Sequence, residues 1–327
     1  SIRCSSRGGA TNLPRLAALD TAQSVLIAGM GGGFDIFCGL PLWHTLRNSG
    51  KSVHLANLSF TNLRFIKDAT MLTPDIYGVH ADSRTVLQYV PEWHLARYLR
   101  ETTGETAPIW CLGGTVAALP LRQSYQALLD HLNPDVLLLI DGGVDSLMRG
   151  DESEVGTIFE DAVSLAAVAS LPSALPRYIA CLGMGAENDV SYGHVLENIA
   201  GLAASGGFLG SCALTRAMEA YTFYENAVAY THGQKYQDPS VINTSIVSAV
   251  QGRFGDYHAT ERTKGHRLHL SPFMSLYWLF DLLAVAEQSL YVPHLQNTQT
   301  RAEAMHVINA VHGQVTPRKT SSHFKGF

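Results

Sequence analysis

The stretch SVLIAGMGGGFDIFCGLPL, residues 24–42, decides the fold. An apolar run is followed by four glycines within five positions, then by Asp35 and an amphipathic segment. A short apolar run that does not alternate with polar residues is typical of a strand buried on both faces. A second stretch, DVLLLIDGGVDSLMRGDE at residues 135–152, follows the same plan. Both stretches predict a buried strand that leads through a glycine turn into a helix.

Short apolar runs and longer helical patterns alternate through the first two thirds of the chain. Alternation of this kind predicts right-handed β-α-β units and a mostly parallel sheet. We therefore expect a three-layer, Rossmann-like α/β fold. The expected strands cover residues 24–30, 52–58, 76–80, 109–112, 135–140 and 178–182. The expected helices between them cover residues 36–48, 92–101, 121–132, 158–169 and 193–204.

The last third of the sequence differs because most of its patterns are helical. Helices are expected at residues 216–228, 240–250, 272–289 and 301–311, with one strand at residues 267–270. No low-complexity linker separates this part from the rest of the chain. We therefore expect an N-terminal arm, residues 1–23, and a single domain, residues 24–327, which becomes rich in helix after about residue 213.

The composition excludes several classes of protein. The formal net charge is −5, whereas a nucleic-acid interface needs clustered Lys and Arg. The sequence contains neither an apolar run long enough to span a membrane nor the apolar core of a secretory signal. The 5 cysteines are widely spaced and form no C-x-x-C pair, which is typical of a reducing compartment. We expect a cytoplasmic protein, and Cys38 is its best-placed candidate for a reactive thiol.

Four of the expected strands end in glycine-containing loops, GMGGGFD, LGGTVA, DGGVDS and LGMGAEND. In a parallel sheet these loops share one edge, and ligands bind there at a topological switch point. Glycine allows a ligand to approach the backbone closely. The residues expected to contact a nucleotide or another anion are Gly31, Gly32, Gly33, Gly142 and Gly143. The alternative is that these glycines only form the tight turns of an α/β fold.

The first loop matches neither of the common nucleotide-binding fingerprints. Phe34 stands where G-x-G-x-x-G requires a glycine or alanine, and no G-x-x-x-x-G-K-[ST] motif occurs. Asp35 is poorly suited to holding a phosphate. It is expected to cap the following helix, or to hold a cation or a sugar hydroxyl.

The loop DGGVDSLMRGDE carries the most carboxylates. Asp141, Asp145 and Glu152 follow a strand expected to be buried, where an unpaired charge is costly. Hard oxygen ligands at this spacing suit Mg²⁺, so these three residues are the expected metal ligands. The alternative is a solvated acidic loop that caps the next helix.

The candidate acid/base groups are His194, His258, Asp145 and Asp35. His194 lies near the start of an expected helix and therefore near the ligand edge of the sheet. His258 lies in the polar segment GRFGDYHATERT, which alternatively forms a surface loop with ordinary ion pairs. The expected substrate-binding residues are Asp82, Arg84, Arg149, Glu187, Asn243, Arg253 and Asp256.

Known families share parts of these motifs. DGGVDSL is similar to the S-G-G-x-D-S signature of ATP-pyrophosphatases, with Asp141 in place of the leading serine. IDGGVD distantly resembles the calcium loop of nucleoside hydrolases. Several stretches together resemble a bacterial and archaeal family known as domain of unknown function number one-one-five-two. That resemblance implies a Rossmann-like core and no established reaction. The stretches are GGGFDIFCGLPLWHTLRNSGKSVHLANLSF, DGGVDSLMRGDE, EDAVSLA, HVLENIA, GGFLG and SIVSAVQGRFGDYHATERT.

The sequence favours an enzyme with a polar cleft at the carboxyl edge of the sheet. We expect a transferase or hydrolase that acts on a small anionic or nucleotide-like metabolite. The cofactor is not specified, and Mg²⁺ and a nucleotide are the candidates. The alternatives are an ATP-using adenylating enzyme and a non-catalytic ligand-binding or scaffold protein. The expected partner is a small-molecule substrate rather than nucleic acid or a membrane, and a homo-oligomer is left open.

Overall fold

A computed structural model describes residues 16–153, 156–186, 190–260, 264 and 268–319 of the chain. Its main feature is a nine-stranded sheet. In chain order the strands of this sheet are β1 (Ser24–Gly29), β2 (Ser52–Leu58), β3 (Thr70–Thr73), β4 (Ile76–Val79), β5 (Ile109–Leu112), β6 (Val136–Asp141), β7 (Arg177–Leu182), β8 (Phe208–Ala213) and β11 (Leu276–Asp281). Their spatial order is β3-β4-β5-β2-β1-β6-β7-β11-β8.

The centre of the sheet is parallel and its two sides are antiparallel. Strands β5, β2, β1, β6 and β7 run in one direction. On one side β4 runs antiparallel to β5, and on the other side β11 runs antiparallel to β7. All six strands expected in the first two thirds of the chain are present, so the mostly parallel α/β fold is confirmed. Of the strand expected at residues 267–270, the structure forms β10 (His269–Leu270), which pairs outside the main sheet, and residue 267 lies outside the described residues.

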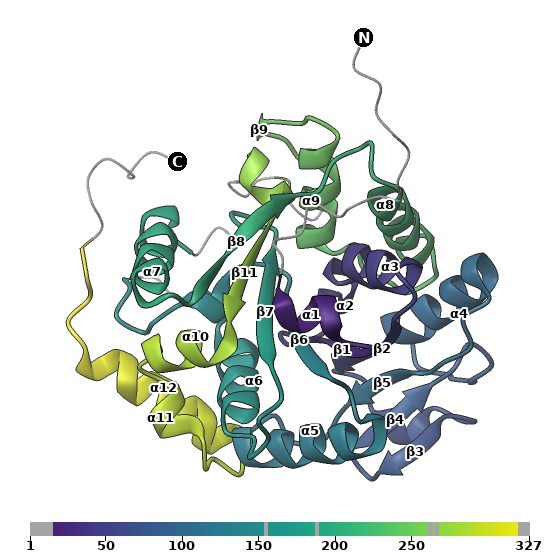
Figure 1. The fold of residues 1–327 in the computed structure, drawn as a ribbon, viewed down its shortest axis with the longest axis horizontal. Coiled ribbons are helices and arrows are strands. Elements are labelled where there is room, and N and C mark those ends of the chain that lie inside the picture. Colours follow the sequence, from purple (N-terminus) through teal and green to yellow (C-terminus); the bar gives the residue numbers. More distant parts are fainter. Residues whose placement is uncertain (1–15, 154–155, 187–189, 261–263, 265–267, 320–327) are drawn as a thin grey trace.

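Helices cover both faces of the sheet and make three layers (Figure 1). Side chains of β1 alternate between the two resulting cores: Val25 and Ile27 pack on one face, and Leu26 and Ala28 on the other. The first core contains α2 (Asp35–Cys38), α3 (Leu40–Asn48), α4 (Pro91–Thr103), α8 (Glu219–His232) and α9 (Val241–Val250). The second contains α5 (Ala118–Leu132), α6 (Phe159–Ala169), α7 (Tyr192–Ser205), α10 (Leu282–Gln288), α11 (Val292–Leu295) and α12 (Arg301–Gln314).

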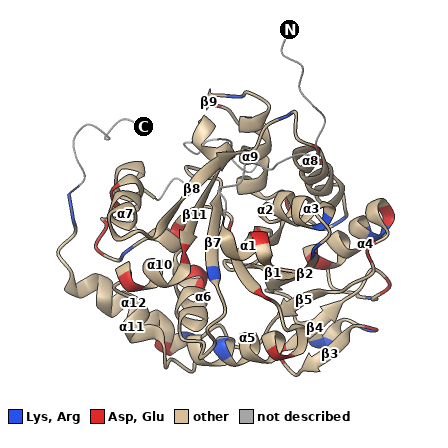
Figure 2. Ribbon diagram, viewed as in Figure 1, with Lys and Arg blue, Asp and Glu red and all other residues tan. Residues whose placement is uncertain are grey.

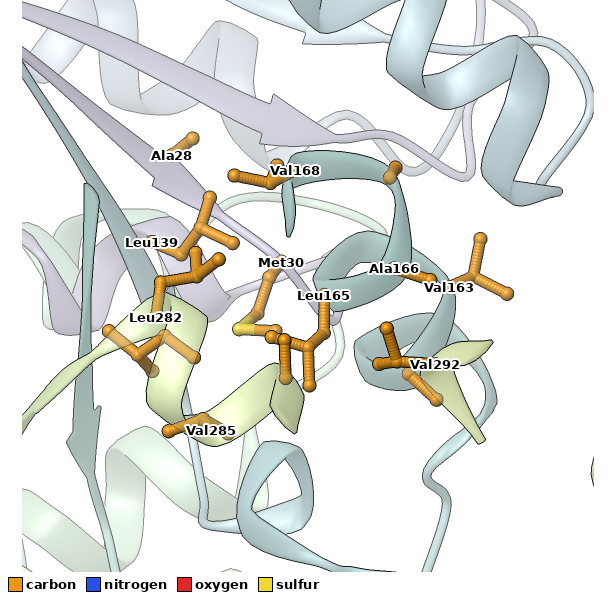
Figure 3. Packing of buried hydrophobic residues seen from close by; sticks show 14 of the residues in the cluster. Ala28, Met30, Leu139, Val163, Leu165, Ala166, Val168, Leu282, Val285 and Val292 are labelled. Carbon is orange, nitrogen blue, oxygen red and sulfur yellow. The ribbon is translucent and has the colours of Figure 1, made fainter. Parts of the chain in front are cut away.

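Helix α6 is apolar around almost its whole circumference and lies inside the second core. Figure 3 shows Val163, Leu165 and Val168 of this helix among Met30 of the β1 loop and Leu282 of α10. A helix with apolar residues on all sides is stable only where every face is covered. The strands on one side and the C-terminal helices on the other provide that cover.

The last third of the chain contains more strand than expected. Residues 272–289 were predicted to form one helix, and this prediction is wrong. They form a short 3-10 turn at Pro272–Ser275, then β11, then α10. Strand β11 lies between β7 and β8, so its apolar residues face both cores. Strands β3 and β8 were also not expected.

The predicted N-terminal arm is described from residue 16. Its short helix α1 (Ala17–Thr21) lies between Leu16 and Ala22, which are both buried, so this part of the arm packs on the sheet. Lys and Arg are interspersed with Asp and Glu along the ribbon rather than gathered on one element (Figure 2). In the described ranges, no helix combines the length and the apolar character needed to cross a bilayer.

Candidate functional site

The first feature of the site is the place where the β1 and β6 loops meet. These strands are parallel neighbours, and Met30 N donates to the carbonyl of Ile140 where they end. From β1 the chain continues to β2 on one side, whereas from β6 it continues to β7 on the other side. The β1/β6 junction is therefore the topological switch point, where α/β sheets bind their ligands.

Asp35 links the two glycine loops at this junction. Its Oδ2 accepts a hydrogen bond from Gly31 N at 2.7 Å, and its carboxylate also accepts one from the backbone of Gly142. A Cβ at Gly31 would lie 2.6 Å from Oδ2 of Asp35, and one at Gly142 would lie 2.7 Å from its Oδ1. These two glycines therefore make room for a carboxylate of the chain itself.

Asp141 and Asp145 come from the β6 loop. Residues 137 and 139 of β6 face α6, and the alternation of a strand turns Asp141 to the same side. Its Oδ2 accepts hydrogen bonds from Ser146 N at 3.0 Å and Ser146 Oγ at 2.5 Å, and Cys181 Sγ lies 3.7 Å away. Asp145 opens the 3-10 turn η2 (Asp145–Leu147), and its Oδ2 accepts from Thr157 N and Oγ1.

The fourth carboxylate, Asp161, lies in the first turn of α6. Ser164 Oγ of the same helix donates to the carbonyl of Met30 at 2.7 Å and fixes α6 against the β1 loop. A Cβ at Gly31 would lie 3.1 Å from both carboxylate oxygens of Asp161. Asp161 is only 6% exposed, and its Oδ1 has no hydrogen-bond partner in the described chain. We call Asp35, Asp141, Asp145 and Asp161 the switch-point cluster.

Burial and mutual repulsion hold protons on this cluster. Burial, followed by the charges of Asp141 and Asp35, raises the pKa of Asp161 well above its ordinary value. Burial and the charge of Asp141 likewise raise the pKa of Asp35, although the Gly31 and Gly142 N–H groups oppose the shift. Burial raises the pKa of Asp141 despite the hydrogen bonds from Ser146. Asp161 lacks such donors, so it is the member that keeps its proton most readily.

The expected metal site is not assembled. Among the described residues, no group of three or more His, Cys, Asp or Glu side chains is placed to hold a metal ion. Asp141 and Asp145 lie in the switch-point cluster, but Glu152 turns away from it. The reason is that Glu152 accepts hydrogen bonds from Arg149 N, Gly150 N and the Asn198 amide.

Glu152 belongs to a second buried polar group, which is completed by Arg318. The Arg318 guanidinium donates to Glu197 Oε2 at 2.6 Å and Asn198 Oδ1 at 2.7 Å, and it lies 3.3 Å from both Glu152 and Asp151. We call Asp151, Glu152, Glu197, Asn198 and Arg318 the Arg318 cluster. Burial acts to raise the pKa of Glu152, but hydrogen bonds from Asn198, Arg149 and Gly150 outweigh it and leave that pKa below its ordinary value.

Comparison with protein families identifies the chain. A family model described as "Protein of unknown function (DUF1152)" matches residues 26–316. The chain belongs to this family. The match confirms the expected resemblance and includes the whole switch-point cluster, whereas Arg318 lies beyond its end. Comparison of this DUF1152 chain with curated proteins and with solved structures found no match.

The two predicted acid/base histidines lie in different places in the DUF1152 chain. His194 is buried at the start of α7, and its Nε2 lies 2.9 Å from the Arg318 carbonyl. It therefore belongs beside the Arg318 cluster. His258 pairs with exposed Asp256 at 2.9 Å, close to the two-residue strand β9 (Gly255–Asp256). Arg253 stacks over Tyr257 in the same segment.

Asn243 and Cys38 support the β1 loop from the α9 side. The Asn243 amide donates to the Phe34 carbonyl at 3.3 Å, and its Oδ1 accepts from Tyr224 Oη at 2.8 Å. Cys38 Sγ lies 3.6 Å from the same oxygen. Burial, with the charges of Asp35 and Asp141, raises the pKa of the Cys38 thiol well above its ordinary value. The thiol therefore stays neutral rather than forming a reactive thiolate.

Of the remaining predicted residues, Asp82 and Arg84 join neither cluster, whereas Arg149 contacts the Arg318 cluster. Asp82 and Arg84 were expected on the ligand rim, but β4 runs antiparallel to β5 and ends at the opposite edge of the sheet. Both residues form exposed ion pairs, Asp82 with Arg100 and Arg84 with Asp68. Arg149 pairs with Asp151 at 3.6 Å. Glu187 lies outside the described residues.

The other glycines of the two loops shape the backbone. Gly32, Gly33 and Gly143 have φ angles of 90°, 57° and 149°, which residues with a side chain rarely adopt. A Cβ at Gly32 would lie 2.6 Å from the ring of Phe60, a side chain that is 57% exposed. These glycines serve the turn and the close approach of Phe60.

Sequence reasoning missed Asp161 and Arg318. A signal for Asp161 was present, because the segment FEDAVSLAAVA is apolar on every face of the helix that it forms. A carboxylate in such a helix is expected to be buried. Arg318 follows the last helix in a polar segment, and no pattern in the sequence indicates that its side chain turns inward.

Proposed function

We propose that this protein is an enzyme, a hydrolase or transferase, that acts on a small hydroxyl-rich metabolite of the nucleoside or sugar type at the β1/β6 junction. The observation that carries the proposal is Asp161, a buried carboxyl with a raised pKa and an unpartnered oxygen, set beside two further carboxyls at the switch point. Such perturbed groups are characteristic of catalytic sites.

The switch-point cluster lowers the stability of the folded state, which is unusual for a purely structural feature. A buried carboxylate without a cation costs several kcal/mol, and an apolar residue of similar size in its place is often neutral or stabilising. Among the described residues, no Lys or Arg contacts Asp35, Asp141 or Asp161. A chain under selection for stability alone gains nothing from this arrangement, whereas an active site uses it to set proton affinities.

The environments of Asp161 and Asp141 assign them different roles. Asp161 has no hydrogen-bond donor and keeps its proton, so it is suited to protonate the leaving oxygen or nitrogen of a substrate. Asp141 receives three donor groups from Ser146 and Cys181, which favour its ionised form relative to Asp161. Ionised Asp141 is suited to take the proton of an attacking water or hydroxyl.

The same geometry argues against a phosphate or pyrophosphate at this point. The N–H groups of Gly31 and Gly142 already donate to Asp35, and four nearby carboxylates repel an anion. This disfavours the ATP-pyrophosphatase alternative, whose glycine loop needs free N–H groups. A neutral, hydroxylated ligand donates hydrogen bonds to carboxylates and fits the cluster better.

A thermal-shift panel tests the proposal. Nucleosides and free sugars, with and without MgCl₂, are expected to raise the Tm, and the corresponding nucleotides are expected to raise it less. A ligand at about 100 times its Kd stabilises by about 2.7 kcal/mol. Asp161→Asn and Asp141→Asn are expected to abolish the shift.

Asp130→Asn is the matched control, because Asp130 is an exposed carboxylate that only accepts from Gln126. It is expected to keep the full shift. If no hydroxylated compound stabilises the protein, or if both cluster variants bind as the wild type does, the proposal fails. A shift that appears only with MgCl₂ would replace it with a metal-dependent mechanism.

A further inference from the structure

The segment after α12 is described through residue 319, and one residue of this part makes its hydrogen bonds to the rest of the molecule. Residues 315–319 follow the helix without regular secondary structure. Thr316, Pro317 and Lys319 are exposed, whereas Arg318 turns inward. The hydrogen bonds that residues 315–319 make to described residues all belong to Arg318. We call residues 315–319 the strap.

Arg318 is held both by its backbone and by its guanidinium. Its N–H donates to the Asp151 carbonyl at 2.6 Å, and its own carbonyl lies 2.9 Å from Nε2 of His194. The guanidinium reaches Glu197, Asn198 and Glu152. A planar guanidinium with several acceptors placed around it is the arrangement that selects Arg over Lys.

The acceptor side of this cluster is built without the strap. Glu152 is completely buried and is held by Arg149 N, Gly150 N and the Asn198 amide. The Asn198 amide also donates to the Leu147 carbonyl, which fixes its Oδ1 toward the guanidinium. Two of the acceptors, Glu152 and Asn198, are therefore held by contacts that do not involve Arg318.

A second group beside the cluster still lacks a partner. The hydroxyl of Tyr291 is fully buried and has no hydrogen bond in the described chain. A Cβ at Gly150 would lie 3.2 Å from this hydroxyl, and burial, followed by the charges of Glu152 and Asp151, raises the pKa of Tyr291. An unpaired polar group in such a place marks a site that its present occupant does not fully satisfy.

We propose that Asp151, Glu152, Glu197 and Asn198 form a guanidinium-binding site, which the strap fills with Arg318 and vacates for a guanidinium-bearing ligand. The chemical class of the ligand is an arginine side chain, either of free arginine or of a peptide. The site is separate from the switch-point cluster, and the inference does not depend on the proposed function.

Arg318→Ala in the full chain, titrated with arginine amide, tests the site. The substitution leaves a buried charge without its cation, so the Tm is expected to fall by at least about 5 °C. Arginine amide at about ten times its Kd is expected to restore about 3–5 °C. Lysine amide is expected to restore little, and in the wild type, where Arg318 competes for the site, arginine amide is expected to change the Tm less than in Arg318→Ala.

Arg301→Ala is the matched control, because Arg301 pairs with Glu160 at the surface. It is expected to show neither the loss nor the recovery. A peptide with the strap sequence VTPRK and its arginine-to-alanine version distinguish a peptide ligand from the free amino acid. Tighter binding of VTPRK than of arginine amide to Arg318→Ala indicates a peptide site, and equal binding indicates a small-molecule site.

Hydrogen exchange of the wild-type protein tests whether the strap leaves the site, and it does not require the variant to fold. The Arg318 amide is protected by the Asp151 carbonyl, so a competing ligand that displaces the strap is expected to speed its exchange several-fold. If arginine amide leaves that exchange rate unchanged, the strap is a fixed structural element and the proposal is overturned. Equal Tm shifts in wild type, Arg318→Ala and Arg301→Ala would also overturn it.

Discussion

The switch-point cluster and the Arg318 cluster differ in how the charge of a buried carboxylate is compensated. Each contains at least one carboxylate that is almost completely buried, Asp161 in the switch-point cluster and Glu152 in the Arg318 cluster. At Glu152 a guanidinium and three N–H or amide donors compensate the charge, and the pKa is lowered. At Asp161 no cation or donor from the described residues compensates the charge, and the pKa is raised. The first arrangement stabilises the fold, and the second stores a proton.

The two clusters therefore respond to pH with opposite signs. The stability that Glu152 contributes is complete above its ordinary pKa of 4.5 and is lost as the pH falls through the lower folded value. The contribution of Asp161 is complete below its ordinary pKa of 3.8 and is lost as the pH rises through the higher folded value. The difference shows which carboxyl the fold keeps charged and which it keeps protonated.

Removal of Glu152 from the Arg318 cluster should lower the free energy of unfolding most. Glu152→Ala leaves the N–H groups of Arg149 and Gly150 and the Asn198 amide without this acceptor and removes the most buried carboxylate beside Arg318, so the free energy of unfolding is expected to fall by about 3–5 kcal/mol. Urea denaturation at pH 7 measures the change. Glu197→Ala removes one partly exposed contact and is expected to cost about 1 kcal/mol or less. Equal losses in the two variants would contradict the compensation at Glu152.

Replacing the ionisable group of Asp161 should stabilise the protein at pH 7. The raised pKa means that folding must keep a proton on Asp161 that the unfolded chain releases at this pH, and Asp161→Asn removes that cost and supplies an amide that can donate to the neighbouring carboxylates. The free energy of unfolding at pH 7 is expected to rise by about 1–3 kcal/mol, since one pKa unit corresponds to about 1.4 kcal/mol. Stability measured from pH 4 to pH 8 is expected to fall less steeply in the variant than in the wild type. A destabilised variant at pH 7 would show that Asp161 is compensated after all.

The same change of charge at Asp35 should have the opposite sign. The Asp35 carboxylate accepts from Gly31 and Gly142, whereas an asparagine has only one acceptor oxygen and turns its NH₂ toward one N–H. Asp35→Asn is expected to lower the free energy of unfolding by about 1 kcal/mol, because relief of repulsion offsets part of the lost hydrogen bond. Thermal denaturation beside Asp161→Asn checks the contrast. A stabilised Asp35→Asn would show that repulsion dominates at both positions.

Loss of a surface ion pair should change the free energy of unfolding least, and it provides the reference for the larger effects. Arg301→Gln breaks an ion pair with Glu160 in which the arginine is more than half exposed. The expected loss is about 0–1 kcal/mol, and it should shrink in high salt. A loss as large as that of Glu152→Ala would show that burial is not what separates the two clusters.

The sequence predicted the strands that are buried on both faces, because their apolar runs admit few other interpretations. It failed at β11 and α10, where SPFMSLYWLFDLLAVAEQ is mostly apolar and contains neither glycine nor an internal proline between the two elements. The change from strand to helix is marked there only by Asp281, whose side chain caps α10 by accepting from Ala284 N. Recognition of that cap would have divided the segment correctly.

The candidate site was predicted in part for a related reason. Asp35, Asp141 and Asp145 follow strands that the apolar runs identify, so their common edge could be inferred. The meeting of Asp161 with them depends on how α6 docks on the β1 loop through Ser164 and Met30. The inward turn of Arg318 depends on acceptors that α7 and the β6 loop supply. Such tertiary contacts leave no local pattern in the sequence.

Helix α6 and the strap lie at opposite ends of the range of local stability in this molecule. Covered on every side, α6 cannot open unless the sheet and the C-terminal helices separate, so its amides should exchange only through global unfolding. The strap is held by one residue and opens without disturbing either core. Asp161 therefore lies on a helix that opens only with the whole fold, whereas the cation that pairs with Glu152 comes from the strap, a segment with few contacts.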